Sequence, residues 1–122
     1  MTNADLVNEF ARSLSMNSPP WNGAGRAEFV FASRGRVVFE TADEDLLLYL
    51  IDKSLPVHNP QLAERVLRLC GKMPASPVHP GLTPAGELVL LIRLQPRHQN
   101  LPDLERGLEQ LFALQDRLNT EE

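Results

Sequence analysis

The chain begins with a run of hydrophobic positions at helical spacing. Within residues 5–14, Leu, Val, Phe and Ala recur three and four positions apart, and charged side chains occupy the opposite face. Thr2 or Asn3 can cap this helix at its start. The polar stretch over residues 15–25 contains two prolines and two glycines, and therefore ends the helix in a loop.

After this loop, hydrophobic residues recur at every second position, which is the period of a β-strand, instead of at helical spacing. Residues 27–32 and 37–40 alternate in this way on either side of a Ser33-Arg34-Gly35 turn, which predicts a β-hairpin. A second turn over residues 41–45 leads to a continuous apolar run at 46–51, typical of a strand buried on both faces. Antiparallel pairing of these three strands is the simplest arrangement.

The second half of the chain contains two more helices and at least one strand. Asn59 followed by Pro60 is a helix start, and apolar residues then recur at helical spacing as far as Met73. Residues 74–84 are rich in proline and predict an extended loop, in which a fifth strand stays an open alternative. Residues 87–94 form another buried strand, and an amphipathic helix starts at Pro102.

The predicted order is therefore α-β-β-β-α-β-(β)-α. Strands grouped between helices, without regular β-α alternation, favour an α+β fold with a small twisted antiparallel sheet and three helices. At 122 residues, and without a repeat or a domain boundary, residues 1–122 form one domain.

Composition and charge narrow the function classes. The net charge of −4 argues against a protein that binds nucleic acid or an anionic membrane surface, because both need clustered basic residues. No apolar run approaches the roughly 18 residues of a membrane span, and the N-terminus does not resemble a signal peptide. A single cysteine cannot form an internal disulfide, so we expect a cytoplasmic protein.

Residues capable of catalysis or metal binding do not form a recognisable pattern. His58, His79 and His98 lie in separate segments without the spacing of a helix-borne metal site. The carboxylates of residues 43–45 are consecutive in a turn, whereas acid–base catalysis needs carboxylates held in a pocket. Cys70 lies on the apolar face of a helix, where a structural thiol is the commoner role. We expect no enzyme activity, no metal and no cofactor.

The apolar face of the second helix is wider than a small monomer needs. This helix either covers the second face of the sheet within one chain or forms a dimer interface, and the limited area of the sheet favours the dimer. The predicted interface residues are Leu62, Val66, Leu69, Cys70 and Met73. The hairpin is also apolar on both faces, which fits a second internal layer or a groove for an extended partner chain.

The C-terminal third carries a more specific pattern. Gly-Glu-Leu-Val-Leu-Leu at 86–91, Leu-Pro-Asp-Leu at 101–104 and Glu-Gln-Leu-Phe-Ala-Leu-Gln at 109–115 follow one another as strand, helix start and helix. In these segments and in its element order, the sequence resembles the class I chaperones of bacterial type III secretion, the CesT/SycE-like family. It is most similar to the SycN-type branch, whose members are subunits of a heterodimeric chaperone for a YopN-type gatekeeper protein.

This resemblance implies a function based on binding. A homodimer, or a heterodimer with a related small chaperone, would hold the N-terminal segment of a secreted effector or gatekeeper protein in extended form. Backbone pairing at a sheet edge and apolar pockets would supply the affinity. The candidate contact residues are Leu6, Phe10, Trp21, Phe29, Val30, Phe31 and Val38. The alternatives are a structural subunit of a multiprotein assembly and a small enzyme that uses the loop histidines.

Overall fold

The computed structural model describes residues 3–13, 25–31, 33–52, 60–70 and 78–120. Within these ranges the helices are α1 (Asn3–Ser13), α2 (Pro60–Cys70), the short 3-10 helix η1 (Pro96–His98) and α3 (Leu101–Thr120). The strands are β1 (Arg26–Phe31), β2 (Gly35–Ala42), β3 (Asp45–Asp52), β4 (His79–Leu82) and β5 (Leu88–Leu94).

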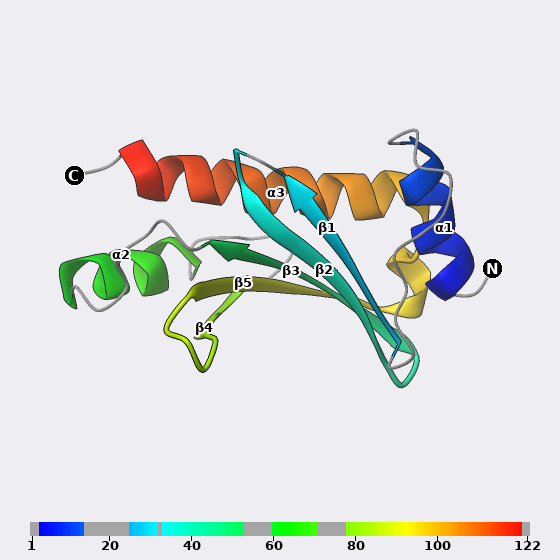
Figure 1. Cartoon of the computed structure of the whole chain (residues 1–122), viewed down its shortest axis with the longest axis horizontal. Coiled ribbons are helices and arrows are strands. Elements are labelled where there is room, and N and C mark those ends of the chain that lie inside the picture. The colour runs from blue at the N-terminus through cyan, green and yellow to red at the C-terminus, as the bar shows by residue number, and fades with distance from the viewer. Residues whose placement is uncertain (1–2, 14–24, 32, 53–59, 71–77, 121–122) are drawn as a thin grey trace.

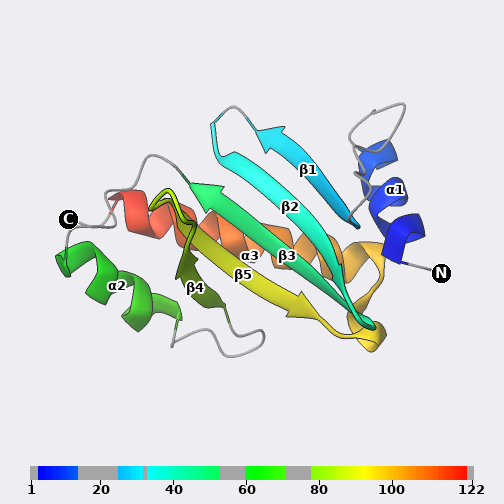
Figure 2. The ribbon, with the colours of Figure 1, turned by 60° about the horizontal axis from the view of Figure 1, so that its bottom comes forward.

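The five strands form one antiparallel sheet in the order β1-β2-β3-β5-β4 (Figures 1 and 2). The predicted α+β class and element order are confirmed, and the optional fifth strand is present. The prediction of a loop throughout residues 74–84 is wrong for 79–82, which form β4. The sequence pattern did not predict this strand because it contains a proline. Pro80 is nevertheless compatible with β4, because β4 is an edge strand and the Pro80 nitrogen faces away from β5.

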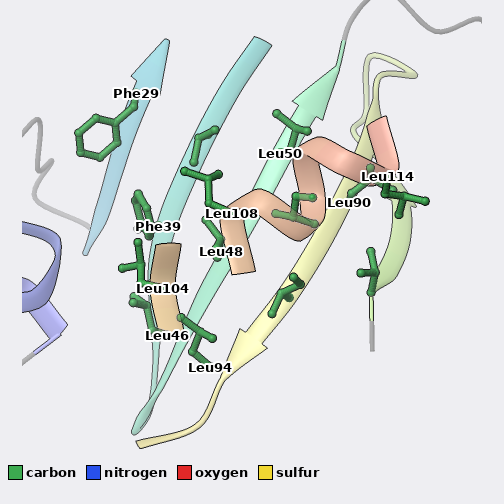
Figure 3. Packing of buried hydrophobic residues seen from close by; sticks show 14 of the residues in the cluster. Phe29, Phe39, Leu46, Leu48, Leu50, Leu90, Leu94, Leu104, Leu108 and Leu114 are labelled. Carbon is green, nitrogen blue, oxygen red and sulfur yellow. The ribbon is translucent and has the colours of Figure 1, made fainter. Parts of the chain in front are cut away.

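α1 and α3 cover one face of the sheet, and α3 crosses it (Figure 1). Leucines of α3, among them Leu104, Leu108 and Leu114, point toward Leu48 and Leu90 of the central strands (Figure 3). α1 adds Phe10, whose ring meets those of Phe29 and Phe39 edge-on at centroid distances of 5.4 and 5.3 Å. Edge-to-face geometry of this kind adds to the stability gained from burial.

α2 packs beside β4 and against α3 (Figure 2). Val66, Leu69 and Cys70 are buried in the same core as the leucines of α3. Arg65 donates a hydrogen bond of 2.5 Å to the carbonyl of Leu118 in the last turns of α3, where helix carbonyls lack partners of their own. The second helix therefore packs against the core of its own chain on the side that α3 covers, and its buried residues do not belong to the cluster on the opposite face of the sheet.

The opposite face of the sheet has a smaller apolar cluster. Val38, Tyr49 and Ile51 are buried there, with Leu47, Val89 and Leu91 partly buried around them. Arg26 donates a 2.6 Å hydrogen bond to the Tyr49 hydroxyl, which donates at 3.2 Å to Glu40. Burial and the nearby Glu40 carboxylate raise the pKa of Tyr49, so the hydroxyl stays protonated.

No helix in the described part of the chain is long and apolar enough to cross a membrane.

Candidate partner-binding surface

The outer edge of β1 has backbone groups available for another strand. The Thr41 amide donates to the Gly25 carbonyl, so 25 and 41 form a hydrogen-bonded pair. Because such pairs alternate along an antiparallel ladder, the N–H and C=O groups of residues 27, 29 and 31 face β2. Those of Glu28 and Val30 therefore point away from the sheet, and no strand of the described chain pairs with them.

The other edge of the sheet differs. The Thr83 amide donates to the Glu87 carbonyl, which makes 81 with 89 and 79 with 91 the hydrogen-bonded pairs of β4 and β5. Pro80 therefore faces outward, where its lack of an N–H breaks no bond to β5 but also offers no donor to a partner. Proline on an edge strand blocks the addition of another strand, and β1 has no proline. The sheet is open to a partner strand at β1.

A cavity of about 320 Å³ lies at the end of β1, between that strand, α1 and α3. Four apolar side chains line it, and Phe31 and Phe112 meet edge-on there at 5.7 Å between ring centroids. Ser13, Glu105 and Glu109 supply the polar lining. The full lining is Phe10, Ser13, Phe31, Glu105, Leu108, Glu109 and Phe112. We call this the aromatic cavity.

A second cavity, of about 430 Å³, lies between the β1–β2 turn, the end of β3 and the last turns of α3. Val30 and Phe31 form its β1 side. Deeper in, Gln115 donates hydrogen bonds of 2.7 Å to the Asp52 carboxylate and to the Arg34 carbonyl. We call this the polar cavity; because Phe31 lines both cavities, they flank the same end of the free edge.

Arg34 joins the turn to α3 beside these cavities. Its guanidinium lies 4.7 Å from the centroid of the Phe112 ring and forms an ion pair with Asp116. A cation over an aromatic face, held by a carboxylate, is a favourable arrangement. The turn also depends on Gly35, whose φ of +116° suits glycine. A Cβ at Gly35 would overlap the carbonyl oxygen of Ile51.

A third hollow, of about 200 Å³, separates α2 from β4 and is mainly apolar. Leu67 of α2 and Leu82 of β4 line it, and they are 65% and 62% exposed. These are two of the three large hydrophobic side chains that are exposed in the described chain; the third is Val30, at 76%. We call the surface around Leu67 and Leu82 the α2/β4 surface.

The predicted partner-binding residues lie in different parts of the structure. Phe10, Val30 and Phe31 line the two cavities at the free edge. Leu6 and Phe29 are packed in the main core, and Val38 lies in the cluster on the opposite face. For those three residues, a partner contact would require this packing to open. Trp21 lies outside the described residues.

The predicted dimer residues are also divided. Val66, Leu69 and Cys70 are buried within their own chain, whereas the Leu62 side chain and Met73 lie outside the described part. Burial raises the pKa of the Cys70 thiol, which disfavours the reactive thiolate. Among the described side chains of α2, the large apolar one that is exposed is Leu67, which is not among the predicted interface residues.

The sequence missed the polar residues of the surface. Arg34, Glu105 and Glu109 reach the cavities only through the packing of α3 on the hairpin, and no short motif contains them. Among the histidines, His79 and His98 are exposed, and His58 is outside the described residues. The described chain contains no group of three His, Cys, Asp or Glu residues that could hold a metal ion.

One titratable cluster lies at the start of α3. Asn100 caps the helix by accepting a 2.9 Å hydrogen bond from the Asp103 amide. Its side chain also donates to the Asp103 carboxylate, which lowers the pKa of Asp103, and contacts from His98 and Arg106 act in the same direction. This cluster stabilises the helix start and does not line the two cavities at β1.

Comparison with protein families gives one match. The model of the type III secretory system chaperone SycN matches residues 4–119, which is nearly the whole chain. Among curated proteins, none matches the sequence significantly.

Solved structures share the fold at low sequence identity. One chain in the structure of the Yersinia pestis type III secretion chaperone SycH, in complex with a stable fragment of YscM2, is 21% identical with a TM-score of 0.69. That alignment covers 99% of this chain and 100% of the other. A chain of the ExsC–ExsE complex is 20% identical with a TM-score of 0.71, over 95% and 90% of the two chains. A chain of the HopA1–SchA chaperone–effector complex is 17% identical with a TM-score of 0.68, over 95% and 89%.

Proposed function

Since the chain belongs to the SycN family of type III secretory system chaperones, we propose that it binds the N-terminal region of a cognate secreted effector or gatekeeper protein. It keeps that region extended and competent for secretion, and it acts in the bacterial cytoplasm before export. The similar solved structures include complexes of chaperones with an effector or another protein fragment, which supports the same kind of role here.

The observation that carries this proposal is the outer edge of β1, which no described strand covers, with two cavities at its end. An extended segment pairs with the outward backbone groups of Glu28 and Val30, which requires no particular sequence. Successive side chains of a strand point to opposite faces of the sheet. Both cavities are lined by residues of α3, so the side chains near Phe31 that point to the α3 face enter them, and these contacts supply the specificity.

We also propose that the chain works as a dimer, with itself or with a related small chaperone. The α2/β4 surface is the candidate interface, because Leu67 and Leu82 expose apolar side chains around one hollow. The proline of β4 prevents strand pairing there, so the packing of side chains would hold this interface together. In this arrangement the predicted residues Val66, Leu69 and Cys70 stabilise the interface indirectly, because their burial fixes α2 on the core of its own chain.

Val30→Pro tests edge pairing directly. Proline removes an outward-facing N–H while leaving the β1–β2 hydrogen bonds intact, and it fits an edge strand. Val30→Thr is the matched control, because it keeps the N–H and nearly the same shape.

The cognate protein is first identified by purifying the chain from secretion-competent cells, and its N-terminal segment is then bound to the purified chaperone. We expect Val30→Pro to weaken binding at least about tenfold, the equivalent of one or two hydrogen bonds, and Val30→Thr to bind like the wild type. Circular dichroism checks that both variants fold. Equal binding by the wild type and a folded Val30→Pro variant would exclude pairing at this edge. Recovery of no secreted protein would count against the chaperone function itself.

A further inference from the structure

Two exposed carboxylates line the aromatic cavity. Glu105 and Glu109 are exposed on α3, and neither forms a hydrogen bond or an ion pair with the described residues. Ser13, the other polar residue of the lining, already donates its hydroxyl to the Phe10 carbonyl at 2.6 Å. A polar group that enters this cavity therefore meets two negative charges and no positive one.

The spacing of the two glutamates increases this effect. Residues four apart lie on the same face of a helix, and like charges at that spacing repel each other. Some other carboxylates of the described chain pair with neighbouring arginines: Asp45 with Arg93 at 2.7 Å, and Glu87 with Arg36 at 3.1 Å. The pair at the aromatic cavity lacks such a neighbour among the described residues, so a positive charge supplied by a partner would relieve the repulsion.

The remaining walls suit the stem and the planar head of a basic side chain. Phe10, Phe31, Leu108 and Phe112 give an apolar lining, and a guanidinium stacks well on an aromatic ring. The chain itself contains such an arrangement, since Arg34 lies over Phe112 and pairs with Asp116. An incoming arginine with Glu105 and Glu109 would reproduce that combination within the cavity.

We propose that the aromatic cavity selects an arginine or lysine side chain of the segment bound along β1, and that Glu105 and Glu109 are the specificity-determining residues. This inference rests on the proposed function, because the basic side chain reaches the cavity from a strand paired with that edge. The preferred segment then has a basic residue within an otherwise apolar, extended sequence, positioned beside Phe31 at the end of β1.

The test uses a phage-displayed library of random 12-residue peptides, selected on the purified chain. Three variants are compared with the wild type: Glu105→Gln/Glu109→Gln, Glu105→Arg/Glu109→Arg, and the control Glu44→Arg/Glu64→Arg. This control changes the net charge by the same amount as Glu105→Arg/Glu109→Arg, but at two exposed glutamates that do not line the cavity. Circular dichroism verifies that each variant folds. If the reversed charges of Glu105→Arg/Glu109→Arg unfold α3, the Glu105→Gln/Glu109→Gln variant still tests the proposal.

We expect the wild type and the control to enrich peptides with one fixed Arg or Lys. The Gln variant should lose this preference while it keeps the apolar pattern, and the Arg variant should favour Asp or Glu. For the best wild-type peptide, replacement of its basic residue by Gln should weaken binding about tenfold to the wild type and less than about twofold to the Gln variant.

Two other outcomes overturn the inference in distinguishable ways. If the wild type selects apolar or acidic residues at that position, or if all variants select the same peptides, then Glu105 and Glu109 do not set specificity. Edge binding itself stands in that case. If the wild type enriches no extended peptide, or if Val30→Pro leaves the enrichment unchanged, the proposed binding along β1 fails, and the inference fails with it.

Discussion

Replacement of Leu67 by glutamine probes the α2/β4 surface and reports how the chain assembles. Leu67 is 65% exposed, so the fold of the single chain depends little on it. Glutamine has about the same length and a helix propensity similar to that of leucine, which leaves α2 intact. A loss of dimer stability in this variant would therefore come from the interface.

The size of the effect follows from the exposure. Complete burial of a leucine side chain stabilises a protein by about 1.5–3 kcal/mol. With 65% of Leu67 still accessible, its burial at an interface contributes about 1–2 kcal/mol in each copy. In a symmetric homodimer the residue occurs twice, so Leu67→Gln should raise the dissociation constant about 30- to 1,000-fold. In a heterodimer it occurs once, and the expected increase is about 5- to 30-fold.

Sedimentation equilibrium over a range of concentrations measures these constants, for the chain alone and after co-expression with a related small chaperone. Val30→Thr is the control, because it changes a strongly exposed apolar side chain at a different surface. Thermal unfolding of Leu67→Gln should match the wild type at concentrations where both are monomeric. A dissociation constant that shifts by less than about twofold, or equally in the control, would refute the α2/β4 surface as the interface.

The remaining predictions concern stability and reactivity. Gly35→Ala should lower the free energy of unfolding by ~3 kcal/mol or more, since it combines a positive φ with overlap against β3. Gly86→Ala, with φ of +84° and open space around it, should lower the free energy of unfolding by only ~1–2 kcal/mol. Urea titration of both variants measures these losses, and equal losses would contradict the steric argument. Asp103 has a lowered pKa when folded, so its ionised form stabilises α3 at pH values above the unfolded pKa near 4, and this contribution disappears as pH falls through the folded pKa. The melting temperatures of Asp103→Asn and the wild type should thus differ at pH 6 and converge near pH 2; a constant difference would argue against this role. Cys70 should react slowly with a thiol reagent at pH 8 and rapidly in denaturant, and fast labelling of the native protein would show that its thiol is accessible.

Local pattern predicted the elements because each has a strong periodicity. The alternation around Ser33-Arg34-Gly35 gave the hairpin, and the helical stripes gave three helices close to their observed bounds. β4 escaped firm prediction because a four-residue edge strand with proline has almost no periodic signal. Its pairing depends on Leu88–Leu94, which a local reading of residues 79–82 does not include.

The sequence predicted the binding surface less completely than the helices and strands, because an amphipathic pattern does not show which apolar residues other segments bury. Phe29 and Phe31 occupy equivalent positions in the alternation of β1, yet Phe29 is enclosed by Phe10 and Phe39, whereas Phe31 borders two cavities. In the same way, Val66 and Leu67 are neighbours on α2, and only the position of β4 and α3 decides that Val66 is buried and Leu67 exposed.

The sequence by itself determined the α+β class and, through the resemblance carried by the segments at 86–115, pointed to the chaperone family. These properties depend on local periodicity and short motifs, which a linear chain carries directly. Only the tertiary structure decided which sheet edge is free, which residues of the apolar faces remain exposed, and that Glu105 and Glu109 meet Phe31 at one cavity. Those features arise where segments distant in sequence pack together, and their physical basis is the geometry of that packing.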